Sequence, residues 1–252
     1  RASLQQGYAM LLLAEILLRS RNGGDDFPFS KDELKEIEKS FVKAIRYMEK
    51  TQHPSGGWTY DPRQKAQLGS YKESATSVGI MHSLAMARQL GIEVDEGTIR
   101  NGIRYLLNRQ HKNGGYINGD WERQPSYHMT SGVAYVLSFY EQYPGVKESL
   151  KRADEYLGRR DDGGYLTSKY PKDGFGRRRI MYGHFYTVLS NRDNSKKVVD
   201  VLTSLFAGAQ KEGLWHSSIA NVGATAFAIM TINSVKKSVK VFEPYSVKPE
   251  ET

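Results

Sequence analysis

The sequence repeats a short phrase in which a glutamine precedes a glycine pair and an aromatic ring. The first copy reads Gln52-His-Pro-Ser-Gly-Gly-Trp58, and the second reads Gln110-His-Lys-Asn-Gly-Gly-Tyr116. Weaker copies occupy residues 160–165 and 210–215, and successive rings are 58, 49 and 50 residues apart. A period of this size indicates one structural unit used several times, so it constrains the fold more than any other feature.

Two kinds of helical segment alternate with these phrases. Segments of the first kind are apolar on nearly every face and begin near Gly7, Gly79, Gly132, Gly183 and Gly223. Such helices are buried on most sides, and a glycine near the start permits close approach of a neighbouring backbone. Segments of the second kind are amphipathic with one buried stripe, and they span residues 31–52, 96–110, 147–159 and 196–209.

The alternation predicts an all-α fold, namely an α/α toroid of about five alternating outer and inner helix pairs. Five buried helices that all need cover favour a closed ring over an open solenoid. We expect a single domain over residues 1–252, because the phrase recurs through most of the length. No phrase precedes the first helix, so either an N-terminal repeat is missing or the ring closes with unequal ends.

The phrase also carries a family resemblance. Gln52, Gly56 and Trp58 form a Gln-x-x-x-Gly-x-Trp pattern that resembles the repeat motif of squalene and oxidosqualene cyclases. The second copy has Tyr116 in place of tryptophan, and the copy at 210–215 is shortened. The inner segments resemble those of bacterial cyclase-like and prenyltransferase-like proteins. The likeness to this terpenoid cyclase and protein prenyltransferase superfamily implies a toroid with its ligand site in a central cavity.

The phrase has a physical interpretation that is independent of the resemblance. Tandem glycines make a tight turn after an outer helix. The following ring would pack against a helix end, and the glutamine amide can cap free backbone groups at a helix terminus. We therefore expect a structural role for the phrase, and we look for ligand-binding residues in the loops that lead into the inner helices.

The residues do not match the catalytic sets that the resemblance implies. Cyclases that protonate an alkene use an Asp-rich motif, whereas the comparable segment here has one acid, Glu73, beside Lys72. The lysine favours the ionised carboxylate, so squalene-type cyclisation is not expected. Prenyltransferases hold zinc through Asp, Cys and His, but this chain has no cysteine. No histidine and carboxylate set has metal-site spacing, and we expect neither a metal nor another cofactor.

Three arginines before the inner segment at Gly183 could bind an anion, because guanidinium groups suit phosphate or carboxylate contacts. They could instead form a solvated surface turn, and His184 could be a hydrogen-bonded core histidine. Trp121 follows Asp120, an acid beside a stacking ring as in sugar sites. The candidate ligand-binding residues are Glu73, Trp121, Tyr127, His128, Arg177, Arg178, Arg179, Tyr182, His184 and Tyr186. We expect His82, inside a buried segment, to be a core residue.

The net charge is +8, from 36 Lys and Arg against 28 Asp and Glu. This charge suits solubility or attraction to an anionic ligand, polymer or surface. Basic residues are spread along the chain, so nucleic acid is not an expected partner. The apolar run at residues 10–14 is too short to span a membrane, while peripheral membrane contact stays open. The chain begins at Arg1 rather than Met, which is compatible with removal of an export signal.

Three functional hypotheses follow. The first is a toroid that lacks the acid motif of squalene cyclases and binds a ligand in its central cavity or a partner on its rim. The second is an enzyme that acts on an isoprenoid diphosphate. The third is a lyase or hydrolase of acidic polysaccharide, with tyrosine and histidine as acid and base. We favour the first, because the fold prediction is clear and no catalytic set is complete.

Overall fold

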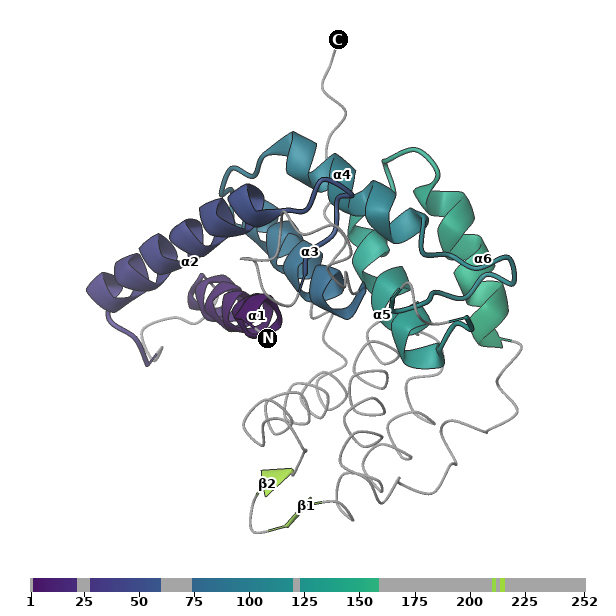
Figure 1. Cartoon of the computed structure of the whole chain (residues 1–252). Helices are drawn as coiled ribbons and strands as arrows, with labels where there is room; N and C mark the ends of the chain where they lie inside the picture. Colours follow the sequence, from purple (N-terminus) through teal and green to yellow (C-terminus); the bar gives the residue numbers. More distant parts are fainter. Residues whose placement is uncertain are drawn as a thin grey trace. The chain divides into compact units, whose positions relative to one another are not determined.

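The protein is helical in the part that the structure describes. The computed structural model describes residues 2–21, 28–59, 74–119, 123–158, 210–211 and 214–215. These residues form six α-helices, a short 3-10 helix and one pair of two-residue strands (Figure 1). The all-α class predicted from the sequence is therefore confirmed.

The chain divides into two compact units. The first comprises Arg1–Arg109, Asn118–Arg123 and Tyr245–Thr252, and the second comprises Gln110–Ile117 and Gln124–Pro244. The single domain expected over residues 1–252 stays a prediction, as does closure into a toroid.

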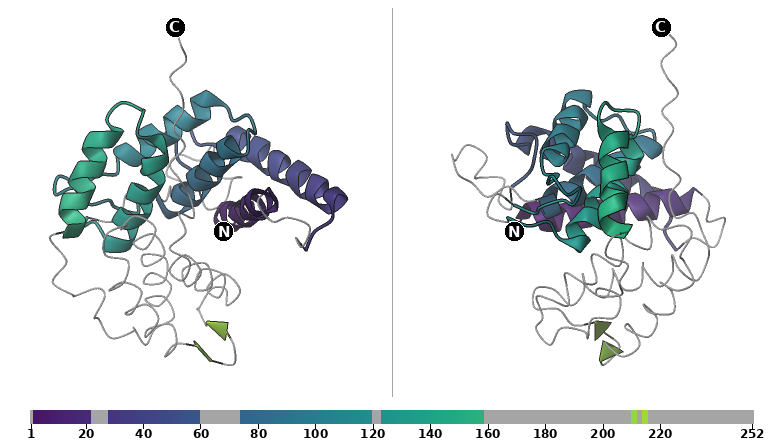
Figure 2. Two further views of the ribbon diagram at one scale, coloured as in Figure 1. Left: turned by 180° about the vertical axis from the view of Figure 1, so that it is seen from behind. Right: turned by 90° about the vertical axis from the view of Figure 1, so that its right-hand side faces the viewer.

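The described helices of the first unit are α1 (Ala2–Ser20), α2 (Lys31–Thr51), α3 (Ser74–Gln89) and α4 (Glu96–Leu107). Helix α1 packs against both α2 and α3, and α3 also packs against α4 (Figures 1 and 2). Where α3 meets α4, the Met81 side chain occupies the space beside Gly102, and a Cβ there would lie 2.3 Å from Sδ of Met81. The glycines near the starts of α1 and α3, Gly7 and Gly79, do not have a neighbour this close. A Cβ on Gly7 would meet only ordinary contacts at 3.5 Å, and one on Gly79 would meet nothing within 4 Å.

The amphipathic helices of this unit begin at capped N-termini. The Ser30 side chain accepts a hydrogen bond from the Glu33 N–H, and the Glu33 carboxylate accepts one from the Ser30 N–H, which together form a capping box. At α4, the Asp95 carboxylate accepts hydrogen bonds from the hydroxyl and the N–H of Thr98, and these bonds lower the pKa of Asp95. Helix α2 buries one stripe, formed by Phe41, Ala44, Ile45 and Met48.

Helix α3 is buried on every face, as its sequence predicts. Each residue from Thr76 to Ala87 is buried. Helix α1 is less enclosed than predicted, because Leu12 is 60% exposed. Its contacts with α2 and α3 cover other parts of its surface, and no other described helix of this unit packs closely on it.

The second unit contains α5 (Tyr127–Leu137), the 3-10 helix η3 (Ser138–Tyr140), α6 (Val146–Gly158) and the strands β1 (Gln210–Lys211) and β2 (Leu214–Trp215). Helix α5 packs against η3 and α6. The buried residues of α6 are spaced three or four apart, as in an amphipathic helix, and comprise Val146, Ser149, Ala153 and Tyr156.

The strands lie within the copy of the phrase at 210–215, where the sequence predicts a turn. They pair antiparallel, with Gln210 opposite Trp215. An isolated antiparallel bridge joins Gln110 to Tyr116 in the same way. In both copies the first residue of the phrase therefore pairs with its ring. The predicted inner segments at Gly183 and Gly223 and the outer segment at 196–209 lie outside the described residues.

Candidate functional site

The first phrase forms a tight turn that joins α2 to the helices that follow it in the same unit. The His53 N–H donates to the Gly57 carbonyl at 2.9 Å, and the Gly56 N–H donates to the His53 carbonyl at 2.8 Å. Gly56 has φ of +94°, a backbone conformation that only glycine adopts readily. A Cβ at this position would lie 2.1 Å from the carbonyl oxygen of Asn101 on α4. Glycine is thus required twice, for its φ angle and for its lack of a side chain.

The Gln52 amide crosses from this turn to the next amphipathic helix. Its Nε2 donates to the carbonyl of Gly56 at 2.8 Å and to that of Thr98, in the first turn of α4, at 2.9 Å. From the sequence we expect the glutamine amide to cap a helix terminus. That function belongs to the ring instead, because Nε1 of Trp58 donates to the carbonyl of Met48 in the last turn of α2 at 2.9 Å.

The ring residue also fixes the turn to the buried helix. The Trp58 N–H donates to the Ser77 hydroxyl of α3 at 3.1 Å, and the Trp58 side chain is fully buried. A Cβ on the preceding Gly57 would lie within 2.8 Å of three atoms of the Tyr105 ring, so this glycine makes room for an α4 side chain.

The second phrase repeats these contacts within the second unit. Nε2 of Gln110 donates to the carbonyls of Gly114 at 2.9 Å and of Ser149, in the first turns of α6, at 2.8 Å. Gly114 again has φ of +94°, and a Cβ there would lie 2.1 Å from the carbonyl oxygen of Arg152. The Tyr116 N–H donates to the Thr130 hydroxyl of α5 at 2.9 Å. The same atoms of the phrase thus bind a buried helix and an amphipathic helix in each unit.

The two copies of the phrase differ in the hydrogen bond that the polar atom of the aromatic side chain forms. Tyr116 has no indole N–H, and its hydroxyl forms a hydrogen bond with the Ser149 hydroxyl, which in turn donates to Oε1 of Gln110 at 2.9 Å. Burial raises the pKa of Tyr116 to about 12. The glutamine and ring side chains therefore hold the protein together and are not available to a ligand.

A loop residue that the sequence analysis did not single out caps the start of α3. The Ser74 N–H donates to the carbonyl of Asn118 at 2.7 Å, and the Ala75 N–H donates to Oδ1 of Asn118 at 3.0 Å. The Asn118-Gly119 pair is a turn signal in the sequence. That signal indicates a loop, but it does not reveal which helix the loop reaches.

The start of α5 differs from the starts of the amphipathic helices. Ser126 occupies the N-cap position without a side-chain capping bond, and the first turn contains no acidic residue. The first two helical residues are Tyr127 and His128, both candidates from the sequence. By contrast, α2 begins with Asp32 and Glu33.

Tyr127 and His128 are the two candidates that fall on a described helix, and they are adjacent in its first turn. The remaining candidates lie outside the described residues; they are Glu73, Trp121, Arg177, Arg178, Arg179, Tyr182, His184 and Tyr186. In the sequence, Glu73 immediately precedes Ser74, the first residue of α3, whose N–H donates to the Asn118 carbonyl.

His82 lies in the middle of α3 and is 1% exposed. Burial lowers its pKa to about 3, so the imidazole is neutral at physiological pH. Its place among buried residues on every side fits the predicted core position. Among the described residues, no group of three histidine or acidic side chains could hold a metal ion. No described helix is long and apolar enough to cross a membrane.

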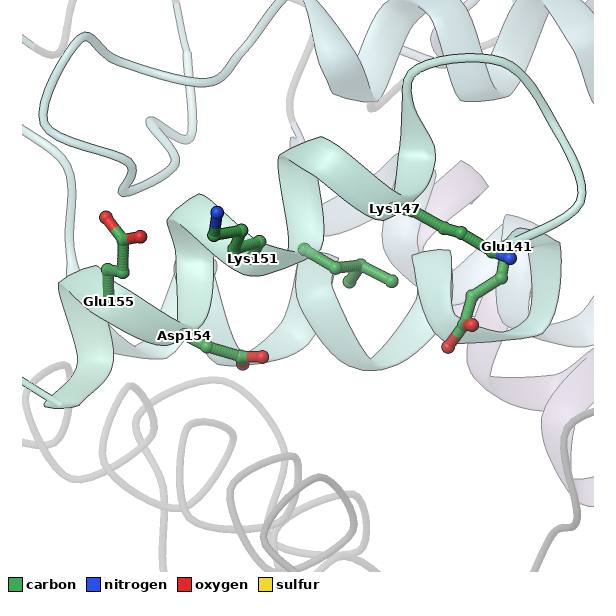
Figure 3. A pocket seen from close by; sticks show the side chains of 6 residues that line it. Glu141, Lys147, Lys151, Asp154 and Glu155 are labelled. Atoms are coloured by element: carbon green, nitrogen blue, oxygen red, sulfur yellow. The ribbon is translucent and has the colours of Figure 1, made fainter.

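A shallow surface depression of about 480 Å³ lies on α6 and the segment before it. Leu150 and five charged side chains line it, namely Glu141, Lys147, Lys151, Asp154 and Glu155 (Figure 3). Partial burial and the nearby Glu141 carboxylate raise the pKa of Asp154.

No protein-family model matches the chain, and no curated protein matches it.

Proposed function

We propose that the protein is an α/α toroid of the terpenoid cyclase and prenyltransferase type that binds a ligand in its central cavity. The supporting observation is the shared contact set of the two turns. In each unit the glutamine, the glycine pair and the ring are fully used in joining a buried helix to an amphipathic helix. Such a joint suits a repeated architecture, and it leaves ligand recognition to the loops before the buried helices.

The described residues favour a ligand that carries an anionic group. Helix N-termini carry partial positive charge, which stabilises anions nearby. The amphipathic helices α2 and α4 begin with their own carboxylates, Glu33 and Asp95. Helix α5 begins with Tyr127 and His128 and has no acid in its first turn. Both the isoprenoid diphosphate and the acidic polysaccharide carry anionic groups. The two hypotheses differ in whether the ligand also has an apolar part.

Thermal unfolding of the full chain with three probes tests the proposal. The probes are farnesyl diphosphate, inorganic diphosphate and polygalacturonate. A ligand at about 100 times its Kd stabilises the folded state by about 2.7 kcal/mol, which corresponds to an increase in Tm of roughly 5–10 °C for a chain of this size. We expect the increase with farnesyl diphosphate and a smaller one with inorganic diphosphate.

Substitutions locate the site. His128→Ala and a triple change of Arg177, Arg178 and Arg179 to alanine should each reduce the increase in Tm with farnesyl diphosphate. Lys112→Ala is the matched control, because Lys112 is an exposed cation at the tip of a turn. Stabilisation by polygalacturonate alone would favour the polysaccharide hypothesis. If none of the probes changes Tm, the proposed anionic ligand is wrong.

The ring architecture has its own test. Small-angle X-ray scattering of the full chain distinguishes a compact closed ring from an extended solenoid by its radius of gyration. A globular chain of this length has a radius of gyration of about 18 Å. A markedly larger value for the monomer would contradict closure whatever the ligand experiments show.

A further inference from the structure

We draw no further inference here: the strongest candidate, the shallow depression on α6 lined by Leu150 and five charged side chains (Figure 3), carries nothing because nothing in the structure shows what covers it.

Discussion

Replacing Gly56 with alanine should destabilise the protein far more than replacing Gly91, which also has a positive φ angle. Two costs combine at Gly56. An alanine with φ of +94° pays about 1–2 kcal/mol for its backbone conformation. Its Cβ would also lie 2.1 Å from the Asn101 carbonyl oxygen, so the turn and α4 must move apart. That movement breaks the bond from Gln52 to Thr98, which contributes about 0.5–1.5 kcal/mol.

The steric displacement adds to these two contributions, and we expect a total loss of roughly 3–5 kcal/mol, which is near the upper end for a single substitution. Gly91 supplies the matched control, because it has φ of +70° but nothing lies within 4 Å of a Cβ built on it. Gly91→Ala should therefore cost only about 1–2 kcal/mol. Gly114→Ala should behave like Gly56→Ala, since its Cβ would meet a carbonyl at the same distance of 2.1 Å.

Urea unfolding followed by circular dichroism measures all three variants against the unmodified chain. Because a Cβ on Gly56 meets a carbonyl and one on Gly91 does not, Gly56→Ala should lower the free energy of unfolding by at least about 1 kcal/mol more than Gly91→Ala, beyond the shared backbone strain. Equal losses would refute this expectation. A large loss for Gly56→Ala with a small one for Gly114→Ala would refute the equivalence of the two turns.

Three further changes test single contacts. Gln52→Ala removes two hydrogen bonds and should cost about 1–3 kcal/mol in urea unfolding, whereas Gln142→Ala, at an exposed position, should cost less than about 0.5 kcal/mol. Burial raises the pKa of Tyr116 to about 12, above the value of about 10 in the unfolded chain. Stability should then fall as the pH rises from 10 to 12, and Tyr116→Phe should remove that slope; an unchanged slope would contradict the assignment. Burial lowers the pKa of His82 to about 3, so stability should fall by up to about 1.4 kcal/mol per unit as the pH drops below 6.5, and a His82→Leu variant that keeps this dependence would show that another group causes it.

Helix type and approximate bounds could be predicted from the sequence, because they depend on local periodicity. Helix α2 ends at Thr51, one residue before its predicted end, and α6 spans Val146–Gly158 against a prediction of 147–159. Helix α4 ends three residues early, at Leu107. Its predicted last residue, Gln110, instead pairs with Tyr116, an arrangement that helical periodicity does not reveal.

The hydrogen-bond partners of the glutamine and the aromatic residue in each phrase could not be predicted from the sequence. Gln52 and Thr98 are 46 residues apart, and nothing near Thr98 marks its carbonyl as an acceptor. Whether the ring caps a helix depends on its chemistry, since an indole N–H reaches the Met48 carbonyl whereas a tyrosine hydroxyl forms a hydrogen bond with Ser149. Of the candidate site, the sequence predicts that Tyr127 and His128 open an inner helix, and they are the first two residues of α5.

The two hydrogen bonds from the Gln52 amide have a consequence for how such a chain folds and evolves. One nitrogen donates both to the local Gly56 carbonyl and to the distant Thr98 carbonyl. A fragment that stopped before residue 98 would lack the Thr98 acceptor, so the amide completes its contacts only when α4 packs on the turn. The segment that contains both of these contacts thus extends from α2 into the first turn of α4. Duplication or recombination that cuts at the ends of a single helix pair would divide this piece, whereas overlapping pieces would preserve it.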